Sequence, residues 1–184
     1  AGNIGGVTVG NYAFSESSVR TGSYEENSNV TTLGRGAFMG CTYLSEIEIP
    51  ANMTRVGDEA FAGCGYYFAD YYDMPLTVTI AEGEPITFGS NVFTGCTIED
   101  FNVPLRMNVT ADFWNGMSVE RIVPAVGHPT LFADKYALYI WENKVPTTLL
   151  RYQPESDADT FEIPETVTAI AANAFLNCER TSVT

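Results

Sequence analysis

Cysteine and histidine are the residue types that serve most often as nucleophiles and metal ligands, and this chain holds five of them. They are Cys41, Cys64, Cys96, Cys178 and His128. No two cysteines are close in sequence, which argues against a zinc site, while their even count leaves disulfides and buried free thiols as alternatives. The chain also lacks G-x-S-x-G, a phosphate-binding glycine loop and H-E-x-x-H. We therefore expect no catalytic residue, no metal site and no cofactor.

Carboxylates are the other reactive groups, with 23 acidic against 9 basic residues and a formal net charge of −14. Among so many acidic residues some carboxylates always lie near one another, so a pair of catalytic carboxylates like that of a glycosidase stays open as an alternative. The run "ESDADT" around Asp157 resembles a calcium loop only faintly, since it lacks the glycine and terminal glutamate of an EF-hand, and a solvated acidic turn is favoured. This net charge repels phosphate backbones and acidic membrane surfaces, so we expect neither nucleic acid nor such a membrane as a partner. It is compatible with a basic protein patch or a cation, or it only keeps the protein soluble.

The length and composition favour a single folded domain over residues 1–184. Hydrophobic residues make up 45% of 184 residues, which is enough for a continuous core. No apolar run approaches the 18 residues of a membrane span, and the start, "AGNIGGVTVG", shows no signal peptide.

The element that must position any site is an internal repeat. An apolar residue followed five positions later by a large aromatic residue occurs six times, with a unit of about 23 residues. The aromatic residues are Phe14, Phe38, Phe61, Phe93, Trp114 and Phe175, and the apolar ones are Val9, Leu33, Val56, Phe88, Val109 and Ile170.

The repeat translates into a strand followed by a tight corner. "SEIEIP" alternates with period two, which predicts a short strand with Ile47 and Ile49 inward, ended by Pro50. A-F-x-G-C is too short for a full helix and predicts one helical or 3₁₀ turn, and the glycine ahead of Phe38 and Phe61 permits a turn. One such coil cannot bury its apolar face, whereas stacked coils can, with their strands in a parallel ladder.

The phrases "LSEIEIPANMTRVGDEAFAGC" and "FEIPETVTAIAANAFLNC" resemble the BspA-type leucine-rich repeats, whose units read roughly L-x-x-I-x-I-P-x-x-V-x-x-I-G-x-x-A-F-x-x-C. The resemblance covers roughly residues 4–64, 76–124 and 160–178, and loosens where Ser17 and Met117 replace the cysteine. It implies a mainly β, right-handed solenoid of about six coils with short 3₁₀ or helical turns. It also implies a non-enzymatic, extracellular or cell-surface protein linked to adhesion.

The cysteines occupy one repeat position, so stacking places them in a column. A small apolar thiol packs well there, which favours buried free thiols over disulfides. Serine and methionine at the same position fit packing and would break a ligand set.

Two intervals between repeats carry extra sequence. Residues 65–75 form an aromatic loop that either packs on the neighbouring coil, which is favoured, or provides a contact platform; its rings are Tyr66, Tyr67, Phe68, Tyr71 and Tyr72. In residues 125–159, "KYALYIW" and "TTLLRYQ" flank "ENKVP", which predicts a β-hairpin insertion.

The outward strand positions predict a polar, acidic face without lysine or arginine, and extended faces of this kind commonly bind partners. The candidate residues are Glu46, Glu48, Thr77, Thr79, Asp100, Asn102, Glu120 and Glu162. The first hypothesis is a binding module for a protein or a glycan. The alternatives are an accessory domain of a carbohydrate-active enzyme, with the aromatic loop stacking sugars, and a structural spacer. The oligomeric state stays open.

Overall fold

The computed structural model of the protein describes residues 6–22, 29–66, 72, 74–109, 111–153, 160–175 and 182–183. Its N-terminal elements are β1 (Val7–Val9), β2 (Thr21–Gly22), β3 (Val30–Leu33), β4 (Glu46–Ile49), β5 (Arg55–Val56), β6 (Thr77–Ile80), β7 (Thr87–Phe88) and β8 (Thr97–Val103). The 3₁₀ helix η1 (Ala111–Trp114) leads to β9 (Ser118–Pro124), β10 (Leu131–Ala133), β11 (Ala137–Glu142), β12 (Val145–Tyr152), β13 (Thr160–Phe161), β14 (Ala169–Ile170) and β15 (Ser182–Val183).

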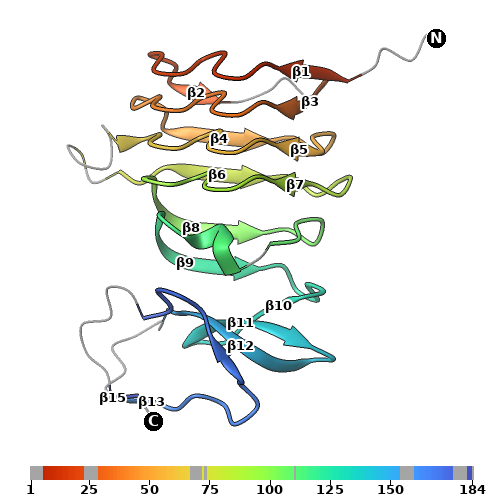
Figure 1. Ribbon diagram of the computed structural model, residues 1–184, viewed down its shortest axis with the longest axis vertical. Coiled ribbons are helices and arrows are strands. Elements are labelled where there is room, and N and C mark those ends of the chain that lie inside the picture. The colour runs from red at the N-terminus through yellow and green to blue at the C-terminus, as the bar shows by residue number, and fades with distance from the viewer. Residues whose placement is uncertain are drawn as a thin grey trace.

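The chain forms a β-solenoid of about seven turns, whose coils are stacked along the long axis of the molecule (Figure 1). One parallel ladder has the order β2-β4-β6, with Glu46 opposite Thr77 and Ile49 opposite Ile80. The parallel pair β8-β9 follows below β6, where the N–H of Leu76 donates to the carbonyl of Thr97 at 2.7 Å. The predicted solenoid with parallel strands is thus confirmed.

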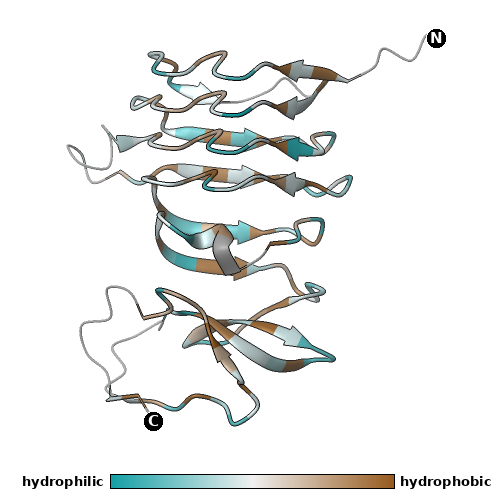
Figure 2. Cartoon of the chain, viewed as in Figure 1, coloured by the Kyte–Doolittle hydropathy of each residue, from teal (hydrophilic) through white to brown (hydrophobic). Residues whose placement is uncertain are grey.

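The alternation of polar and apolar residues along β4 determines which face of the strand packs into the core. Ile47 and Ile49 are fully buried, while Glu46 is exposed and Glu48 is partly exposed. Apolar and polar residues accordingly alternate along the ladder strands (Figure 2). Burying one isoleucine side chain contributes about 1.5–3 kcal/mol, so this pattern fixes which face of the strand turns inward.

A second parallel ladder, in the order β1-β3-β5-β7, is a feature that the sequence analysis missed. It is formed by the apolar residues that precede each aromatic residue, with Leu33 paired to Val56 and both fully buried. Strands of two residues, such as β5 and β7, are too short to show alternation in sequence. The coils that contain β4 and β6 therefore have two strands each rather than one.

The corner of each coil consists of tight turns that also bond to the next coil. The N–H of Cys41 donates to the carbonyl of Phe38 at 3.1 Å, and the N–H of Phe38 donates to Ala60 in the next coil at 2.8 Å. Gly36 and Gly40 have φ values of 57° and 72°, the left-handed region that glycine adopts without strain. The corner, predicted as a single helical or 3₁₀ turn, is therefore a short series of tight turns.

Gly57 illustrates why glycine recurs ahead of the aromatic residue. A Cβ atom at this position would lie 2.7 Å from the carbonyl carbon of Gly34 and 2.8 Å from the amide nitrogen of Arg35. Its φ is not in the positive region. This glycine is required by close approach of two coils, rather than by a turn as we expected.

The aromatic residues of four coils form a continuous column of stacked rings: Phe14, Phe38, Phe61 and Phe93. Their centroids are 5.0, 5.4 and 5.6 Å apart, with interplanar angles between 8° and 15°. Beyond Phe93 the stack changes to edge contacts, with Phe101 at 5.6 Å and with Phe113 at 6.2 Å. Trp114 packs edge-on against Phe113 and does not extend the column.

The expected hairpin is formed by β11 and β12, and β10 adds a third antiparallel strand. Its turn residues Asn143 and Lys144 have φ values of 52° and 65°, as a type I′ turn requires. The last repeat then joins this insertion, because β14 pairs in parallel with β12. The insertion therefore lies between the fifth repeat and the sixth.

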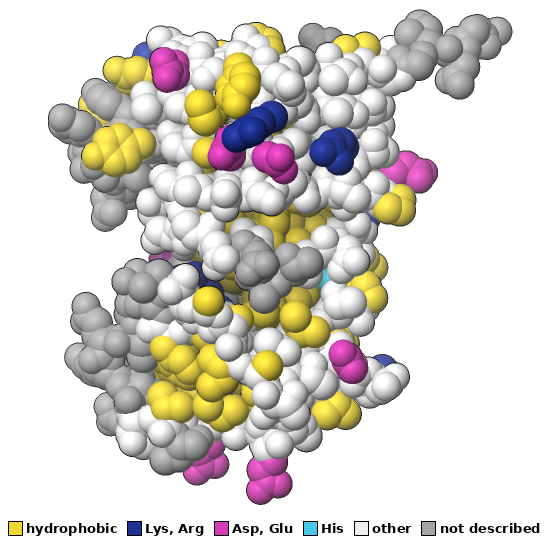
Figure 3. All heavy atoms as spheres, viewed as in Figure 1, with side chains coloured by type: hydrophobic (Ala, Val, Ile, Leu, Met, Phe, Trp, Pro, Cys, Tyr) yellow, Lys and Arg dark blue, Asp and Glu magenta, His cyan; other side chains and the backbone are white. Residues whose placement is uncertain are grey.

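The last repeat belongs to a second hydrophobic cluster, built on Tyr139, Leu149 and Tyr152. Phe175 stacks on Tyr152, with centroids 5.6 Å apart, instead of on the ring column. Ile170, the apolar residue that precedes Phe175 in this repeat, is 52% exposed and lies on β14, the edge strand of the sheet β10-β11-β12-β14. Hydrophobic side chains gather on the surface of this lower part of the molecule (Figure 3).

Several predicted residues lie outside the described residues: Tyr67, Phe68, Tyr71, Asp157 and Cys178. Of the aromatic loop, Tyr66 and Tyr72 are described, with exposed fractions of 55% and 60%.

Candidate binding surface

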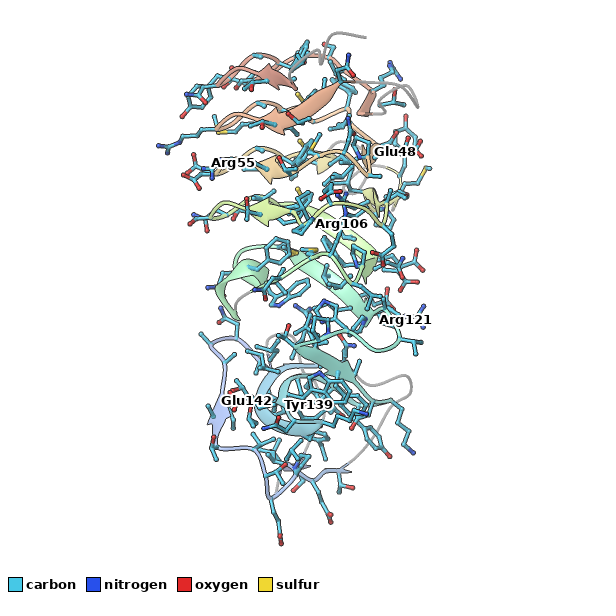
Figure 4. All side chains as sticks on the ribbon, turned by 90° about the vertical axis from the view of Figure 1, so that its right-hand side faces the viewer. Glu48, Arg55, Arg106, Arg121, Tyr139 and Glu142 are labelled. Atoms are coloured by element: carbon cyan, nitrogen blue, oxygen red, sulfur yellow. The ribbon has the colours of Figure 1, made fainter. Side chains whose placement is uncertain are left out.

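The outward positions of β4, β8 and β9 carry a series of carboxylates that we call the acidic ladder: Glu46, Glu48, Glu99, Asp100 and Glu120. In β8 and β9 two successive residues lie outside the core between buried ones, because Ile98 and Phe101 are both buried. This irregular spacing presents Glu99 as well as Asp100, and the sequence analysis named only the latter. Glu48 and Arg121 point outward on one side of the stack, opposite Arg55 (Figure 4).

Seven of the eight predicted face residues lie on consecutive strands. Thr77 and Thr79 are opposite Glu46 and Glu48 in the register of β4 and β6, and Asn102 is exposed on β8. Glu162 is different: it follows β13, which pairs with β15 in a separate sheet. The structure does not bring Glu162 into the acidic ladder.

Arg121 adds a cation that the predicted acidic face did not include. Its Nε donates to Oδ1 of Asp100 at 2.9 Å, and its second guanidinium nitrogen donates to Oδ2 at 2.7 Å. These hydrogen bonds lower the pKa of Asp100, although both side chains are about half exposed. Solvent screening keeps the contribution of such a pair to stability within about 1 kcal/mol. Its main consequence is a fixed, electrically neutral pair of donors and acceptors.

A groove with a cavity volume of about 720 Å³ lies between β9 and the inserted strand β10. The Asp100–Arg121 pair and Asn102 line one side. Phe132 and Trp141 line the other, with rings stacked at 5.3 Å and an interplanar angle of 15°. The sequence analysis missed this groove, although it named Asp100 and Asn102, because its two sides are joined only by the insertion.

The floor of the groove is closed by Gln153, whose side chain imitates a neighbouring strand. Its amide oxygen accepts from the N–H of Ile122 at 3.0 Å, and its amide nitrogen donates to the carbonyl of Ile122 at 2.8 Å. Arg151, near the end of β12 and two residues before Gln153, donates to the carbonyl of Val119. Backbone N–H and C=O groups on the free edge of β9 thus form hydrogen bonds with side chains of the insertion.

His128 joins the solenoid to the insertion and is 1% exposed. Its Nε2 lies 2.9 Å from the carbonyl of Met107, and its Nδ1 accepts from the N–H of Leu131 at 3.0 Å. These partners assign the proton to Nε2 of a neutral ring. Burial lowers the pKa of His128. The only histidine is therefore a structural connector in this arrangement.

Arg106 is a buried structural residue that no sequence pattern indicated. Its guanidinium donates to the carbonyls of Pro50 and Ala51 at 2.9 Å and to those of Met53 and Glu84 at 3.0 Å. It thereby satisfies carbonyls at the corner where adjacent coils leave their strands.

The described cysteines form the expected column of buried free thiols. Each donates to the carbonyl of the aromatic residue one coil earlier, as Cys64 does to Phe38 and Cys96 to Phe61, both at 3.1 Å. Burial raises the pKa of Cys96 to about 12, which keeps the thiol protonated. A side chain with a small apolar body and one donor suits this corner.

Within the described part of the chain, no group of three or more His, Cys, Asp or Glu side chains is arranged to hold a metal ion. The described helical segments likewise include none with the length and hydropathy of a membrane span.

Residues 9–113 and 152–184 match the BspA type leucine rich repeat region, in six copies. The matched residues are well over half of the chain, and the protein belongs to this family of leucine-rich repeat proteins. The unmatched stretch contains β9, β10, β11 and most of β12, so the side of the groove formed by Phe132 and Trp141 lies in sequence that the repeat does not describe.

Two solved structures are similar in fold. One is the pneumococcal vaccine antigen PcpA, with a TM-score of 0.72, 14% identity, 96% of this chain covered and 42% of that chain. The other is a leucine-rich repeat protein from Eubacterium ventriosum, with a TM-score of 0.56, 17% identity, and 87% and 48% covered. This chain therefore spans less than half of either protein. A search of curated proteins gives no match.

Proposed function

We propose that this protein is a non-enzymatic, extracellular or cell-surface binding module that recognises a basic patch on a protein partner through the acidic ladder. The observation that carries the proposal is the outward series of five carboxylates along β4, β8 and β9, with one arginine among them. A surface with an excess of one charge steers an oppositely charged surface toward it and suppresses wrong partners. Membership in the repeat family and the vaccine-antigen neighbour support a surface location.

The test is binding of the purified chain to an immobilised panel of extracellular-matrix proteins, measured by biolayer interferometry. The double variant Glu46→Lys/Glu48→Lys should weaken binding by about 1–2 kcal/mol, or roughly 5- to 30-fold, because it replaces two attractions with repulsions. Most of the loss should appear in the association rate and should shrink at high salt.

The matched control is Glu142→Lys/Glu165→Lys, which changes the net charge equally at exposed positions away from the acidic ladder. An equal loss in both variants would show that only net charge matters. Glu162→Lys, measured separately, tests whether the C-terminal part contributes, and we expect it to behave like the control because Glu162 lies in another sheet.

A further inference from the structure

From the groove between β9 and β10 we infer a second binding site, one for a short neutral carbohydrate chain. Its cavity of about 720 Å³ is within the range of about 300–1,000 Å³ that is typical of small-ligand sites. The groove shares Asp100 with the acidic ladder. The proposed protein contact is tested at Glu46 and Glu48 on β4, which do not line the groove, so failure of the sugar site would leave the proposed function standing.

The two stacked rings offer an apolar platform beside polar groups. Phe132 and Trp141 are each half-buried and lie on adjacent antiparallel strands. The indole N–H of Trp141 donates to the carbonyl of His128 at 3.1 Å, which fixes the ring. Pyranose rings present a face of C–H groups, which packs on an aromatic ring, with hydroxyls around the rim.

The polar side of the groove matches hydroxyl groups, which both donate and accept hydrogen bonds. The bidentate pair of Asp100 and Arg121 places acceptors and donors side by side in a fixed geometry. The exposed amide of Asn102 adds one group of each kind. Neighbouring hydroxyls of a sugar can engage such a pair without any change of charge.

The charge of the lining favours a neutral ligand. The charged residues of the groove are two acids and two bases, Asp100, Asp134, Arg121 and Lys135, in a chain with a net charge of −14. A sulfated or phosphorylated ligand would face the nearby carboxylates of Glu99 and Glu120.

The strand edges bordering the groove argue against an extended peptide. Strand addition needs free N–H and C=O groups at alternate positions. Both backbone groups of Ile122 are bonded to Gln153, and the N–H of Leu131 donates to His128. Pro124 has no N–H to offer. Ring faces and side chains are therefore the means of recognition left in this groove.

The experiment is an array of neutral gluco-, manno-, galacto- and N-acetylglucosamine oligosaccharides probed with the purified chain, followed by calorimetry with an oligosaccharide that is retained. Phe132→Leu keeps apolar volume but removes one ring, and should weaken binding at least about tenfold. Asn102→Ala, at an exposed position, should also weaken it and covers the case in which Phe132→Leu fails to fold. Affinity should stay constant between about 0.05 and 0.5 M salt, since the ligand carries no charge.

Two controls separate this site from the other surfaces. Tyr72→Leu removes an exposed ring of the aromatic loop, and Glu46→Lys/Glu48→Lys alters the proposed protein contact; neither should change sugar binding. The inference is overturned if no neutral oligosaccharide is retained, or if Tyr72→Leu abolishes binding while Phe132→Leu and Asn102→Ala do not.

Discussion

Replacing Gln153 should release the edge of β9 that borders the groove. Gln153→Leu keeps a similar volume but removes the bonds of 3.0 and 2.8 Å to the N–H and C=O of Ile122. Ile122 is fully buried, so water cannot replace the lost partners without opening the strand. Each orphaned backbone group costs about 1–3 kcal/mol, so the variant should lose about 2–4 kcal/mol of unfolding free energy.

Urea unfolding measures that loss, and hydrogen exchange of the Ile122 amide shows where it arises. Glu142→Leu, an exposed change on the same hairpin, is the control and should stay within about 0.5 kcal/mol of the wild type. Gln153→Glu should also be destabilised, because a carboxylate accepts from the N–H of Ile122 but cannot donate to its carbonyl. An unchanged exchange rate at Ile122 in Gln153→Leu would refute the reasoning, whatever the global stability.

Three further predictions concern the interior. Burial lowers the pKa of His128 in the folded state. The stability that depends on the neutral ring should therefore be fully present above the ordinary pKa of about 6.5 and be lost as the pH falls from there through the folded-state pKa. His128→Gln should flatten this part of a stability–pH curve, and an unaltered slope would contradict the assignment. Gly57→Ala should destabilise by about 1–3 kcal/mol in chemical denaturation, because its Cβ would meet backbone of the preceding coil, whereas Gly10→Ala, with open space around it, should be nearly neutral. Phe61→Ala should cost about 3–5 kcal/mol in thermal or urea unfolding, against about 1–2 kcal/mol for Phe14→Ala, since Phe61 is fully buried and Phe14 is 43% exposed; equal losses would mean that the ring column is not the core.

The parts of the fold that follow from local pattern could be predicted from the sequence. The alternation in "SEIEIP" places Ile47 and Ile49 in the core because a strand has a period of two. The two-residue strands of the second ladder could not be found that way, since Arg55–Val56 contains no full period. The sequence signal at these strands is the apolar residue five positions before each aromatic one, which marks the repeat without indicating a strand.

The binding surfaces, like the fold, could be predicted from the sequence only in part. Glu46 and Glu48 could be placed outward from alternation, and the shift between Ile98 and Phe101 that also presents Glu99 could not. The groove depends on contacts between residues about thirty positions apart, such as Gln153 with Ile122, and Ile122 lies in sequence that the repeat does not match. No periodicity can indicate a contact of that kind.

The proposed protein-binding role is tested most directly by hydrogen–deuterium exchange of the chain alone and in complex with the matrix protein that it retains. We predict protection in residues 46–49, 77–80, 97–103 and 118–124, the strands that carry the acidic ladder and the neighbouring threonines. Protection in residues 30–33, 55–56 and 87–88 of the second ladder, with the acidic ladder unchanged, would contradict the account.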